Sequence, residues 1–410
     1  MSYGSKVRFA DRTTPPHVFT LVLVASMTAL TMNVFLPSLP SMAAHFNTEY
    51  RVIGLAVSLF LAVNAVLQVI VGPLSDWFGR RVVLIVAITI FLGATLGCIY
   101  APTVEVFLFF RMCQAVVAAG MVLSRAIVRD VVPMNQAASM IGYVTMGMSL
   151  VPMIAPAIGG KLDEWFGWQA SFWLMFGFGV TLLCLVLTDL GETLHTRKAR
   201  FSEQFRGYPT LLSSYRFWGY ALAAAFASGA FFAYLGGAPF VATEYFGLPP
   251  SQMGFFFGFP AVGYLLGNAF TGRFASRFGI NRMVLWGCIL TTCGISLHLC
   301  VYLAGLRDPF LFFAFFTFVG LGNGLVMPNA AAGLVSVRPD LAGSASGLGG
   351  AIQIAGGAAL SALAAALLTE GSTPLPLLIV MVATSVGSLV SICVVLMRER
   401  QLAGSPDALT

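Results

Sequence analysis

Charged residues are scarce in this chain: Asp, Glu, Lys and Arg together make up 9% of its 410 residues, whereas 58% are hydrophobic. A soluble domain carries about 25% charged residues, so the composition excludes a soluble globular protein. The apolar runs are continuous rather than alternating, which also excludes the pattern of a transmembrane β-barrel.

The chemistry of an enzyme is also missing. No acidic residue lies within an apolar run, no nucleotide-binding P-loop is present, and the seven cysteines lack the paired spacing of a metal site. The four histidines are scattered along the chain, at His17, His45, His195 and His298. We therefore expect no catalytic residues, no metal and no cofactor. A sensor that transports nothing remains an alternative.

Long apolar segments fill most of the chain. A helix that crosses a bilayer needs roughly 20 apolar residues. Twelve segments meet this requirement: 18–39, 52–71, 82–101, 106–128, 137–159, 169–188, 217–238, 251–271, 283–304, 310–335, 343–368 and 374–397. The sequence predicts an all-α membrane protein with twelve transmembrane helices.

The few basic residues indicate the orientation of these helices. The N-terminal segment resembles no cleaved signal, so 18–39 is expected to be a retained span. Placing both termini in the cytoplasm puts 18 of the 22 Lys and Arg residues on that side. The net charge of +6 then reflects membrane topology, and no nucleic-acid partner is expected.

The chain contains an internal repeat. The segment 72–81 follows the second span; it begins with Gly72 and ends with Phe-Gly79-Arg-Arg. A similar segment, 272–282, occurs 200 residues later. A duplicated six-span unit predicts two pseudo-symmetric six-helix bundles with a binding site at their interface. We expect bundles at 1–188 and 217–410, joined by a cytoplasmic linker at 189–216.

The first of these loops has a physical logic of its own. Glycine permits a tight turn between two helices, and Asp76 can face the positive end of a neighbouring helix. Arg80 and Arg81 can pair with Asp130 or with helix C-termini. We expect this cluster to latch the cytoplasmic side shut in one state; the alternative is an ordinary basic loop. The predicted gate consists of Gly72, Asp76, Gly79, Arg80, Arg81, Arg129 and Asp130.

Several motifs resemble one family. The loop at 72–81 and the stretch from Arg111-Met-Cys-Gln114 to Gly120 resemble motifs of the major facilitator superfamily. The run from Pro152 to Gly160 resembles the fifth-helix motif of its drug antiporters. Further stretches are similar to its bicyclomycin-resistance-like (Bcr/CflA) branch: Ser124 to Asp130, Phe166 to Phe172, Glu192-Thr193-Leu194, Gly237-Ala-Pro239, Pro328-Asn329-Ala330 and Gly343 to Gly347.

The resemblance implies the major facilitator fold, in which two bundles rock about a central cavity. It also implies an antiporter that exports small drug-like molecules in exchange for protons, of the kind that confers multidrug or antibiotic resistance. The expected location is the bacterial cytoplasmic (inner) membrane, and the expected partners are a small-molecule substrate, lipid and protons. We expect a monomer.

The fifth span carries prolines and glycines that bend and pack helices. Pro152 and Pro156 remove backbone hydrogen bonds, while Gly159 and Gly160 allow close helix approach. We expect this helix to seal the cavity against its pseudo-mate, Gly343 to Gly357. Generic packing of small residues is the alternative.

One position departs from the pattern of the Bcr/CflA branch. Such antiporters usually carry an acidic residue in the first helix, where this chain has Asn33 before Val-Phe-Leu-Pro37. Asparagine can form hydrogen bonds but cannot titrate, so proton coupling is in doubt. Glu244 and His298 are the substitute proton carriers to consider, although an exposed loop acid and a packed neutral histidine are the simpler interpretations.

Without an acid in the first helix, the positive charge of Arg111 has no acidic partner within the predicted spans. Arg111 lies inside the fourth span, at a depth similar to that of Asn33 in the first. We expect the two side chains to be hydrogen-bonding neighbours, with Gln114 close by, and a substrate anion to supply the missing charge. The alternative is that Arg111 extends to the outer membrane surface.

Other side chains are weaker candidates for contact with a substrate, because aromatic, methionine and amide groups in spans can face a cavity. The candidates are Phe35, Tyr143, Met146, Tyr234, Asn268, Asn323 and Gln353. The function we expect is export of amphipathic drugs or metabolites by alternating access. The alternative is a facilitator or uptake carrier for an organic anion or zwitterion bound by Arg111.

Overall fold

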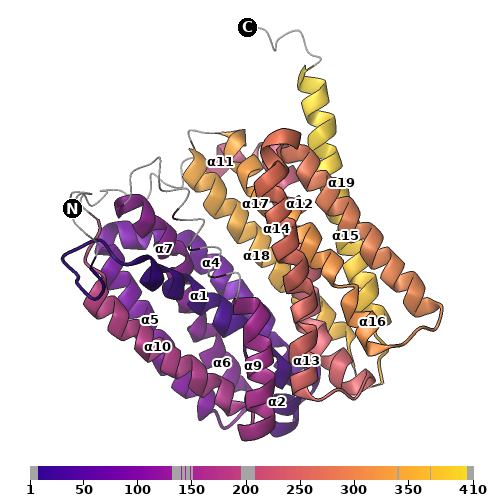
Figure 1. The fold of residues 1–410 in the computed structure, drawn as a ribbon, viewed down its shortest axis with the longest axis horizontal. Coiled ribbons are helices and arrows are strands. Elements are labelled where there is room, and N and C mark those ends of the chain that lie inside the picture. Colours follow the sequence, from indigo (N-terminus) through magenta and orange to yellow (C-terminus); the bar gives the residue numbers. More distant parts are fainter. Residues whose placement is uncertain are drawn as a thin grey trace. The chain divides into compact units, whose positions relative to one another are not determined.

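The computed structural model describes residues 8–131, 151–194, 208–338, 341–369 and 371–403, together with positions 140, 144 and 148. In these residues the regular elements are helices, and they gather into two compact units (Figure 1). The first unit is Met1–Phe201 with Leu248–Phe255; the second is Ser202–Gly247 with Phe256–Thr410. The short segment from Leu248 thus groups with the first unit, although it follows the seventh predicted span.

The first unit contains the helices that follow the first six predicted spans. They are α1 (Val18–Asn33), η1 (Leu36–Ser38), α2 (Leu39–His45), α3 (Tyr50–Ile53), α4 (Leu55–Phe78), α5 (Arg80–Ile99), α6 (Val104–Gln114), η2 (Ala115–Val117), α7 (Ala118–Val131), α9 (Val151–Phe166) and α10 (Gln169–Asp189). Helix α13 (Pro250–Phe256) begins in the segment that joins this unit.

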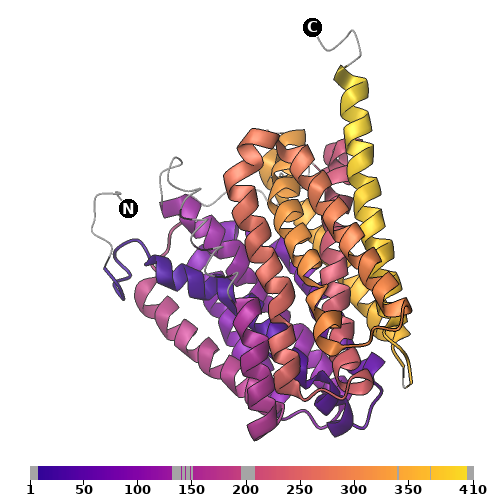
Figure 2. The ribbon, with the colours of Figure 1, turned by 45° about the vertical axis from the view of Figure 1, so that its right-hand side comes forward.

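The second unit repeats this order. It contains α11 (Tyr208–Leu212), α12 (Tyr215–Phe240), η4 (Val241–Tyr245), α14 (Gly258–Phe278), α15 (Ile280–Leu303), α16 (Pro309–Ala314), α17 (Thr317–Val337), α18 (Ala342–Leu367) and α19 (Leu375–Ala403). The last turns of α19 extend past the neighbouring helices of this unit (Figure 2).

Among the described residues, 11 helical segments are long and apolar enough to cross a membrane. They coincide with every predicted span except the fifth, of which only the second part is described, as α9. The prediction of an all-α membrane protein is confirmed.

Proline breaks the first span. Helix α1 ends at Asn33, and a single 3-10 turn over Leu36–Ser38 leads into α2. Pro37 carries no backbone N–H group, so the regular hydrogen-bond pattern of the helix cannot continue through it. The carbonyl groups of the last turn of α1 are consequently left to find other donors.

A buried carboxylate fixes where α1 begins. Asp189, at the end of α10, is fully buried and accepts hydrogen bonds from Ala10 N (2.8 Å), His17 N (2.9 Å) and Thr20 Oγ1 (2.7 Å). The segment before α1 is therefore attached to the end of α10. The sequence placed Asp189 only at the start of a linker and missed this role.

In the second unit, α12 forms the centre. It packs against α17, α18 and α19, and nearly all its residues from Phe217 onward are buried. Alanine and glycine supply much of its surface, which lets neighbouring backbones approach closely. This packing explains why a helix rich in small residues is the most enclosed one.

A pair of glycine motifs joins α14 to α17. Gly263 and Gly267 on α14 face Gly320 and Gly324 on α17, and each stands against backbone atoms of the other helix. A side chain at these positions would collide with backbone, which cannot yield as a flexible side chain can. The sequence analysis did not single out this contact.

The glycine contact predicts a large effect of one methyl group. We expect Gly320→Ala to lower the free energy of unfolding by about 1–3 kcal/mol, because the methyl would overlap the Pro260 carbonyl. The measurement is thermal unfolding of the purified protein in detergent. Gly347→Ala is the matched control, since nothing lies within 4 Å of the methyl it would add. Equal melting temperatures for the two variants would contradict the proposed packing.

Candidate functional site

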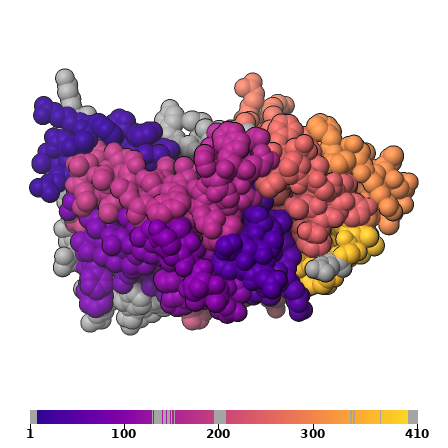
Figure 3. All heavy atoms as spheres, turned by 90° about the horizontal axis from the view of Figure 1, so that it is seen from below, coloured from indigo at the N-terminus to yellow at the C-terminus, as the bar shows by residue number. Residues whose placement is uncertain are grey.

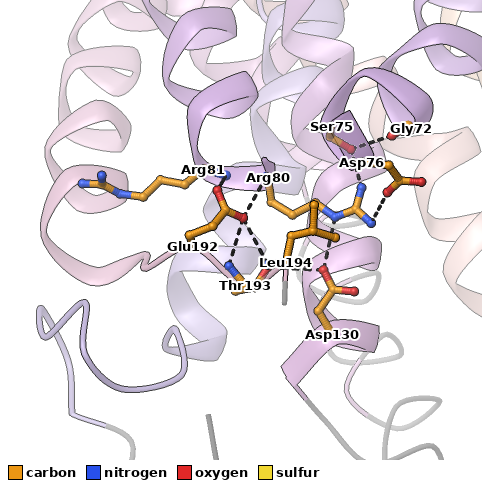
Figure 4. A network of polar contacts seen from close by, with 9 residues as sticks. All are labelled: Gly72, Ser75, Asp76, Arg80, Arg81, Asp130, Glu192, Thr193 and Leu194. Carbon is orange, nitrogen blue, oxygen red and sulfur yellow. Dashed lines mark hydrogen bonds and ion pairs between the residues drawn. The ribbon is translucent and has the colours of Figure 1, made fainter. Parts of the chain in front are cut away.

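The turn between α4 and α5 gathers charges of both signs. Gly79 has a φ of +102°, a conformation that suits glycine, and it reverses the chain so that Arg80 points back toward α4. The Arg80 guanidinium pairs with Asp76 Oδ1 at 2.5 Å and with Asp130 Oδ2 at 3.1 Å (Figure 4). It also donates a hydrogen bond to Ser75 Oγ.

A second carboxylate closes this cluster from the end of the bundle. Glu192, just beyond α10, accepts hydrogen bonds from the backbone N–H groups of Arg80 (3.0 Å) and Arg81 (3.3 Å). It thereby satisfies unpaired donors at the start of α5, where negative charge is favourable. Thr193 Oγ1 adds a 3.3 Å hydrogen bond to Asp130. Figure 4 shows the carboxylate between the two arginines and its own backbone turn.

Most of the predicted gate residues meet here. Asp76, Gly79, Arg80 and Asp130 lie in one cluster, while the guanidinium of Arg81 donates to the Leu187 carbonyl. The carbonyl of Gly72 accepts from Ser75 Oγ, and the side chain of Arg129 lies outside the described residues.

The cluster depends on a residue that the sequence analysis did not assign to it. Glu192 served there only as part of a family resemblance, because no local pattern links it to a loop 111 residues earlier. Together these contacts connect the ends of α4, α5, α7 and α10, so the end of the first unit is held by charge rather than by apolar packing alone.

Arg111 is completely buried inside the first unit. Its guanidinium donates hydrogen bonds to Thr31 O (2.8 Å), Ala56 O (3.2 Å) and Gln114 Oε1 (2.7 Å). The alternative that Arg111 extends to the membrane surface is therefore wrong.

Two aromatic rings complete this enclosure. The rings of Phe35 and Phe60 lie 4.2 and 4.4 Å from the central carbon of the Arg111 guanidinium. Aromatic faces carry partial negative charge and attract a cation. Gln114 in turn donates to Thr95 Oγ1 at 2.8 Å. The protein itself therefore surrounds the cation with partial negative charges, although none of them is a carboxylate.

The break in α1 explains why a carbonyl is free for Arg111. The regular backbone bonds of α1 end with Val34 N donating to Leu30 O, which leaves the Thr31 carbonyl at the helix C-terminus without a backbone donor. A helix C-terminus carries about half a negative charge. The end of α1 and Arg111, far apart in sequence, thus belong to the same arrangement.

The predicted hydrogen bond between Asn33 and Arg111 is wrong. Asn33 is buried, but its Nδ2 donates to Ala29 O at 2.7 Å within its own helix. Its Oδ1 has no hydrogen-bond partner among the described residues. Thr31 and Asn33 differ by two positions, about 200° around a helix, so they present different sides to α6. Depth alone could not reveal this difference in direction.

The candidates in the second unit have separate surroundings. Tyr234 is buried against Phe257 and Phe316, with ring centroids 5.0 and 4.4 Å apart. Asn268 Nδ2 donates to Tyr264 O, Asn323 is buried, and Gln353 is half-buried. Tyr143 and Met146, predicted for the first bundle, lie outside the described residues.

The two substitute proton carriers differ in environment. His298 is buried among the rings of Phe312, Phe315 and Phe316, at 4.5, 4.9 and 5.2 Å. Glu244 is exposed in the π-helical turn η4. These surroundings agree with the simpler interpretations, a packed ring and a surface acid. In the described part of the chain, no group of three His, Cys, Asp or Glu side chains could hold a metal ion.

Two glycines of the proline and glycine motif in helix α9 pack closely against backbone of other segments. A methyl group on Gly159 would collide with the carbonyl of Val34, and one on Gly160 with that of Pro250. Within the first unit, the backbone nearest these glycines thus belongs to the broken part of α1 and to the start of α13. Pro156 lies inside α9, and Pro152 near its start.

The end of α9 presents two adjacent carboxylates with different environments. Asp163 is buried and accepts a 2.8 Å hydrogen bond from Ser41 Oγ on α2, a segment that adjoins the end of α9 in Figure 3. Burial raises the pKa of Asp163 above its ordinary value, although hydrogen bonds from serine oppose the shift. Both acids lie beyond the predicted span 137–159 but inside α9, which continues to Phe166.

Glu164 shows the opposite shift. Its Oε1 accepts from Ser251 N at 3.0 Å and its Oε2 contacts Lys161 Nζ at 3.0 Å. The hydrogen bond from Ser251 and the Lys161 ammonium hold the pKa of Glu164 below its ordinary value. Burial and hydrogen bonding therefore shift the pKa values of these two neighbouring acids in opposite directions.

Comparison with known proteins agrees with this architecture. The sequence model of the Major Facilitator Superfamily matches residues 21–295 and 238–408. A transporter of Bacillus subtilis (strain 168), called uncharacterized MFS-type transporter YdgK, is 29% identical over 379 residues, which cover 90% of this chain and 93% of that protein. A bicyclomycin resistance protein homolog of Haemophilus influenzae is 27% identical, with coverage of 87% and 91%.

Two further similarities extend over nearly the whole chain. Multidrug resistance protein D of Escherichia coli (strain K12) is 26% identical, with coverage of 91% and 93%. Among solved structures, a bacterial homolog of the human lysosomal transporter Spinster, inward-facing and occupied, superimposes with a TM-score of 0.71 at 17% identity. That likeness covers 93% of this chain and 96% of the other, and it concerns the fold alone.

The position of Glu192 predicts a stability effect. We expect Glu192→Ala to lower the free energy of unfolding by about 1–2 kcal/mol, because it removes the acceptor that caps α5. Glu192→Gln retains one acceptor oxygen and should lose less. Thermal unfolding in detergent measures both. Glu49→Ala is the control, since Glu49 forms an exposed pair with Arg51; an equal effect of Glu49→Ala and Glu192→Ala would refute the capping role.

The contacts around Arg111 predict that a positive charge alone cannot stabilise the first unit, and that the shape of the guanidinium is also required. We expect Arg111→Lys to destabilise the protein by about 3 kcal/mol, because an ammonium group cannot reach Thr31, Ala56 and Gln114 together. Unfolding in detergent and the yield of folded protein are the measurements. Arg51→Lys, at an exposed arginine, is the control. If Arg111→Lys melts like the parent protein, the three hydrogen bonds do not stabilise the unit.

Proposed function

The chain belongs to the Major Facilitator Superfamily, and we propose that it exports small amphipathic compounds across the bacterial inner membrane by alternating access. The observation that carries this proposal is end-to-end similarity to relatives named for resistance to bicyclomycin and to multiple drugs. In the proposed orientation both termini are cytoplasmic, and the protein acts as a monomer.

The cluster around Arg80 fits such a cycle. Its ion pairs lie at the end of the first unit, between helices that are consecutive or nearly so in sequence. A transporter that alternates between two states needs each bundle to remain rigid while the bundles move. We assign the Asp76–Arg80–Asp130 cluster, closed by Glu192, to this rigidity on the cytoplasmic side.

The uptake or facilitation of an organic anion is the alternative. This alternative assumed that the charge of Arg111 is balanced by a bound substrate anion. The guanidinium is instead enclosed by carbonyl groups and aromatic rings, so a bound anion is not needed to explain its presence in the membrane. This observation favours export of amphipathic compounds over selective binding of anions.

Proton coupling requires a group other than Asn33. We propose Asp163 as the proton carrier of this chain ahead of Glu244, because Asp163 is buried, hydrogen-bonded to Ser41 and has a raised pKa. Protonation of Asp163 as the pH falls would remove its negative charge and weaken the hydrogen bond that it accepts from Ser41, between α2 and α9. Export would then be faster when the outside is acidic.

The test is a flux panel in proteoliposomes. Cationic, neutral and anionic compounds are loaded, and flux is measured with and without a pH gradient. We expect gradient-stimulated flux of amphipathic cations or neutral compounds, and loss of the stimulation in Asp163→Asn. Glu164→Gln is the matched control, because it alters the neighbouring acid whose pKa is lowered.

The possible results separate the proposals. If the pH gradient still stimulates flux in Asp163→Asn, Asp163 is not the proton carrier, and the proposal of export is unaffected. Flux restricted to anions would overturn the export proposal in favour of the alternative. Asn33→Asp restores a carboxylate in the first helix, and new proton dependence in this variant would support the account of a lost acid.

A further inference from the structure

The second copy of the repeated loop keeps the turn but not the charge balance. Gly79 and Gly279 have similar backbone angles, with φ of 102° and 83° and ψ of 147° and 156°. In the first loop Arg80 is neutralised by Asp76 and Asp130. The second loop has Ser276 at the position of Asp76, and no acidic residue occurs between 272 and 282.

Three arginines around this second loop are exposed. They are Arg273 and Arg277 at the end of α14, and Arg282 at the start of α15. None of them forms an ion pair with a described residue. The carboxylate of Glu399, near the end of α19, is bound by Arg216 and by the side chain of Asn281.

Aromatic rings run directly beside the arginines. Phe270, Phe274 and Phe278 form one stripe along α14, with successive centroids 4.6 and 6.0 Å apart, and Trp286 of α15 lies 4.9 Å from Phe278. Phe270 is 41% exposed and Trp286 is 37% exposed. The stripe therefore forms part of the outer surface of the unit, where a spanning helix meets lipid.

The arginines lean over these rings. The guanidinium carbon of Arg273 lies 6.0 Å from the centroid of Phe274, and that of Arg277 lies 5.6 Å from the centroid of Phe278. Apolar rings on the lipid side, followed by cations at the helix end, match the two parts of a phospholipid. Arginine binds phosphate through paired hydrogen bonds, and tryptophan favours the level of the headgroups.

We propose that Arg273, Arg277 and Arg282, with Phe274, Phe278 and Trp286, bind an anionic phospholipid of the adjoining leaflet. The phosphate lies among the arginines and an acyl chain lies along the aromatic stripe. Positive charge without an ion-pair partner among the described residues argues for this occupant, since each basic residue near an anionic membrane surface contributes about 1 kcal/mol. The inference requires only that α14 and α15 span the membrane, so it is independent of the transported compound.

The first loop does not offer the same surface. The Arg80 side chain is only 10% exposed and already paired, and the Glu192 carboxylate lies against Gly79. The open space beside Gly279, where no atom lies within 4 Å of an added methyl, contrasts with this arrangement. We therefore expect one preferred anionic lipid per chain, at the second loop, although the two halves repeat one another.

The test uses the full-length protein in nanodiscs of phosphatidylcholine that contain increasing amounts of phosphatidylglycerol. Native mass spectrometry counts the phosphatidylglycerol molecules retained by the protein. We expect one to be retained in preference to phosphatidylcholine, and Arg273→Gln with Arg277→Gln to weaken its retention by about tenfold. Arg273→Lys with Arg277→Lys keeps the charge and should retain most of the binding.

A matched control separates a site from general attraction. Arg8→Gln with Arg12→Gln removes the same charge from two other exposed arginines. Equal losses in the two glutamine variants would overturn the proposal, as would equal retention of the two lipids or displacement by inorganic phosphate. Quenching of Trp286 fluorescence by brominated phosphatidylglycerol, taken as the difference from Trp286→Phe, locates the lipid; no quenching difference would also overturn it.

Discussion

A polar group inside a membrane must find its partner within the protein, because the hydrocarbon core offers no hydrogen bonds. Arg111 meets this constraint at the cost of regularity in α1. Helix α1 ends at Asn33, the Thr31 carbonyl has no backbone donor among the described residues, and the guanidinium joins α1, α4 and α6 through one planar group. The rings of Phe35 and Phe60 pack against the same guanidinium. Around this cation, the Asn33 side chain turns back to the carbonyl of Ala29 in its own helix.

The two units place different side chains at equivalent positions of the repeat. Phe316 lies as far from the start of α16 as Arg111 lies from the start of α6. Phe316 packs against Tyr234, Phe312 and His298. An aromatic cluster thus occupies in one unit the place that a cation occupies in the other. The loops show a similar contrast, since one is neutralised by its own acids and the other leaves its arginines exposed. The repeat preserves the backbone, while the chemistry of each copy has diverged.

Some parts of the site could be predicted because they depend on local pattern. Asp76 and Arg80 are four residues apart on either side of a glycine turn, so their contact follows from the spacing. Other parts could not. Glu192 reaches the start of α5 only because α10 returns alongside α5, and Ser41 reaches Asp163 only because α2 and α9 end together. The hydrogen bond expected between Asn33 and Arg111 failed for a related reason: depth along a helix is readable from sequence, but direction around it depends on packing.

The sequence by itself determined the all-α membrane class, the approximate positions of the eleven described spans, the charge asymmetry that indicates orientation, the repeat, and the family. Each of these rests on composition or on residues close together in the chain, where the hydrophobic effect and short-range geometry dominate. Only the tertiary structure decided what surrounds Arg111, which acid caps α5, what lies against Gly159, and which loop has arginines without an ion pair among the described residues. These are contacts between distant segments, and their energies depend on helix rotation and on burial, neither of which a single sequence encodes locally.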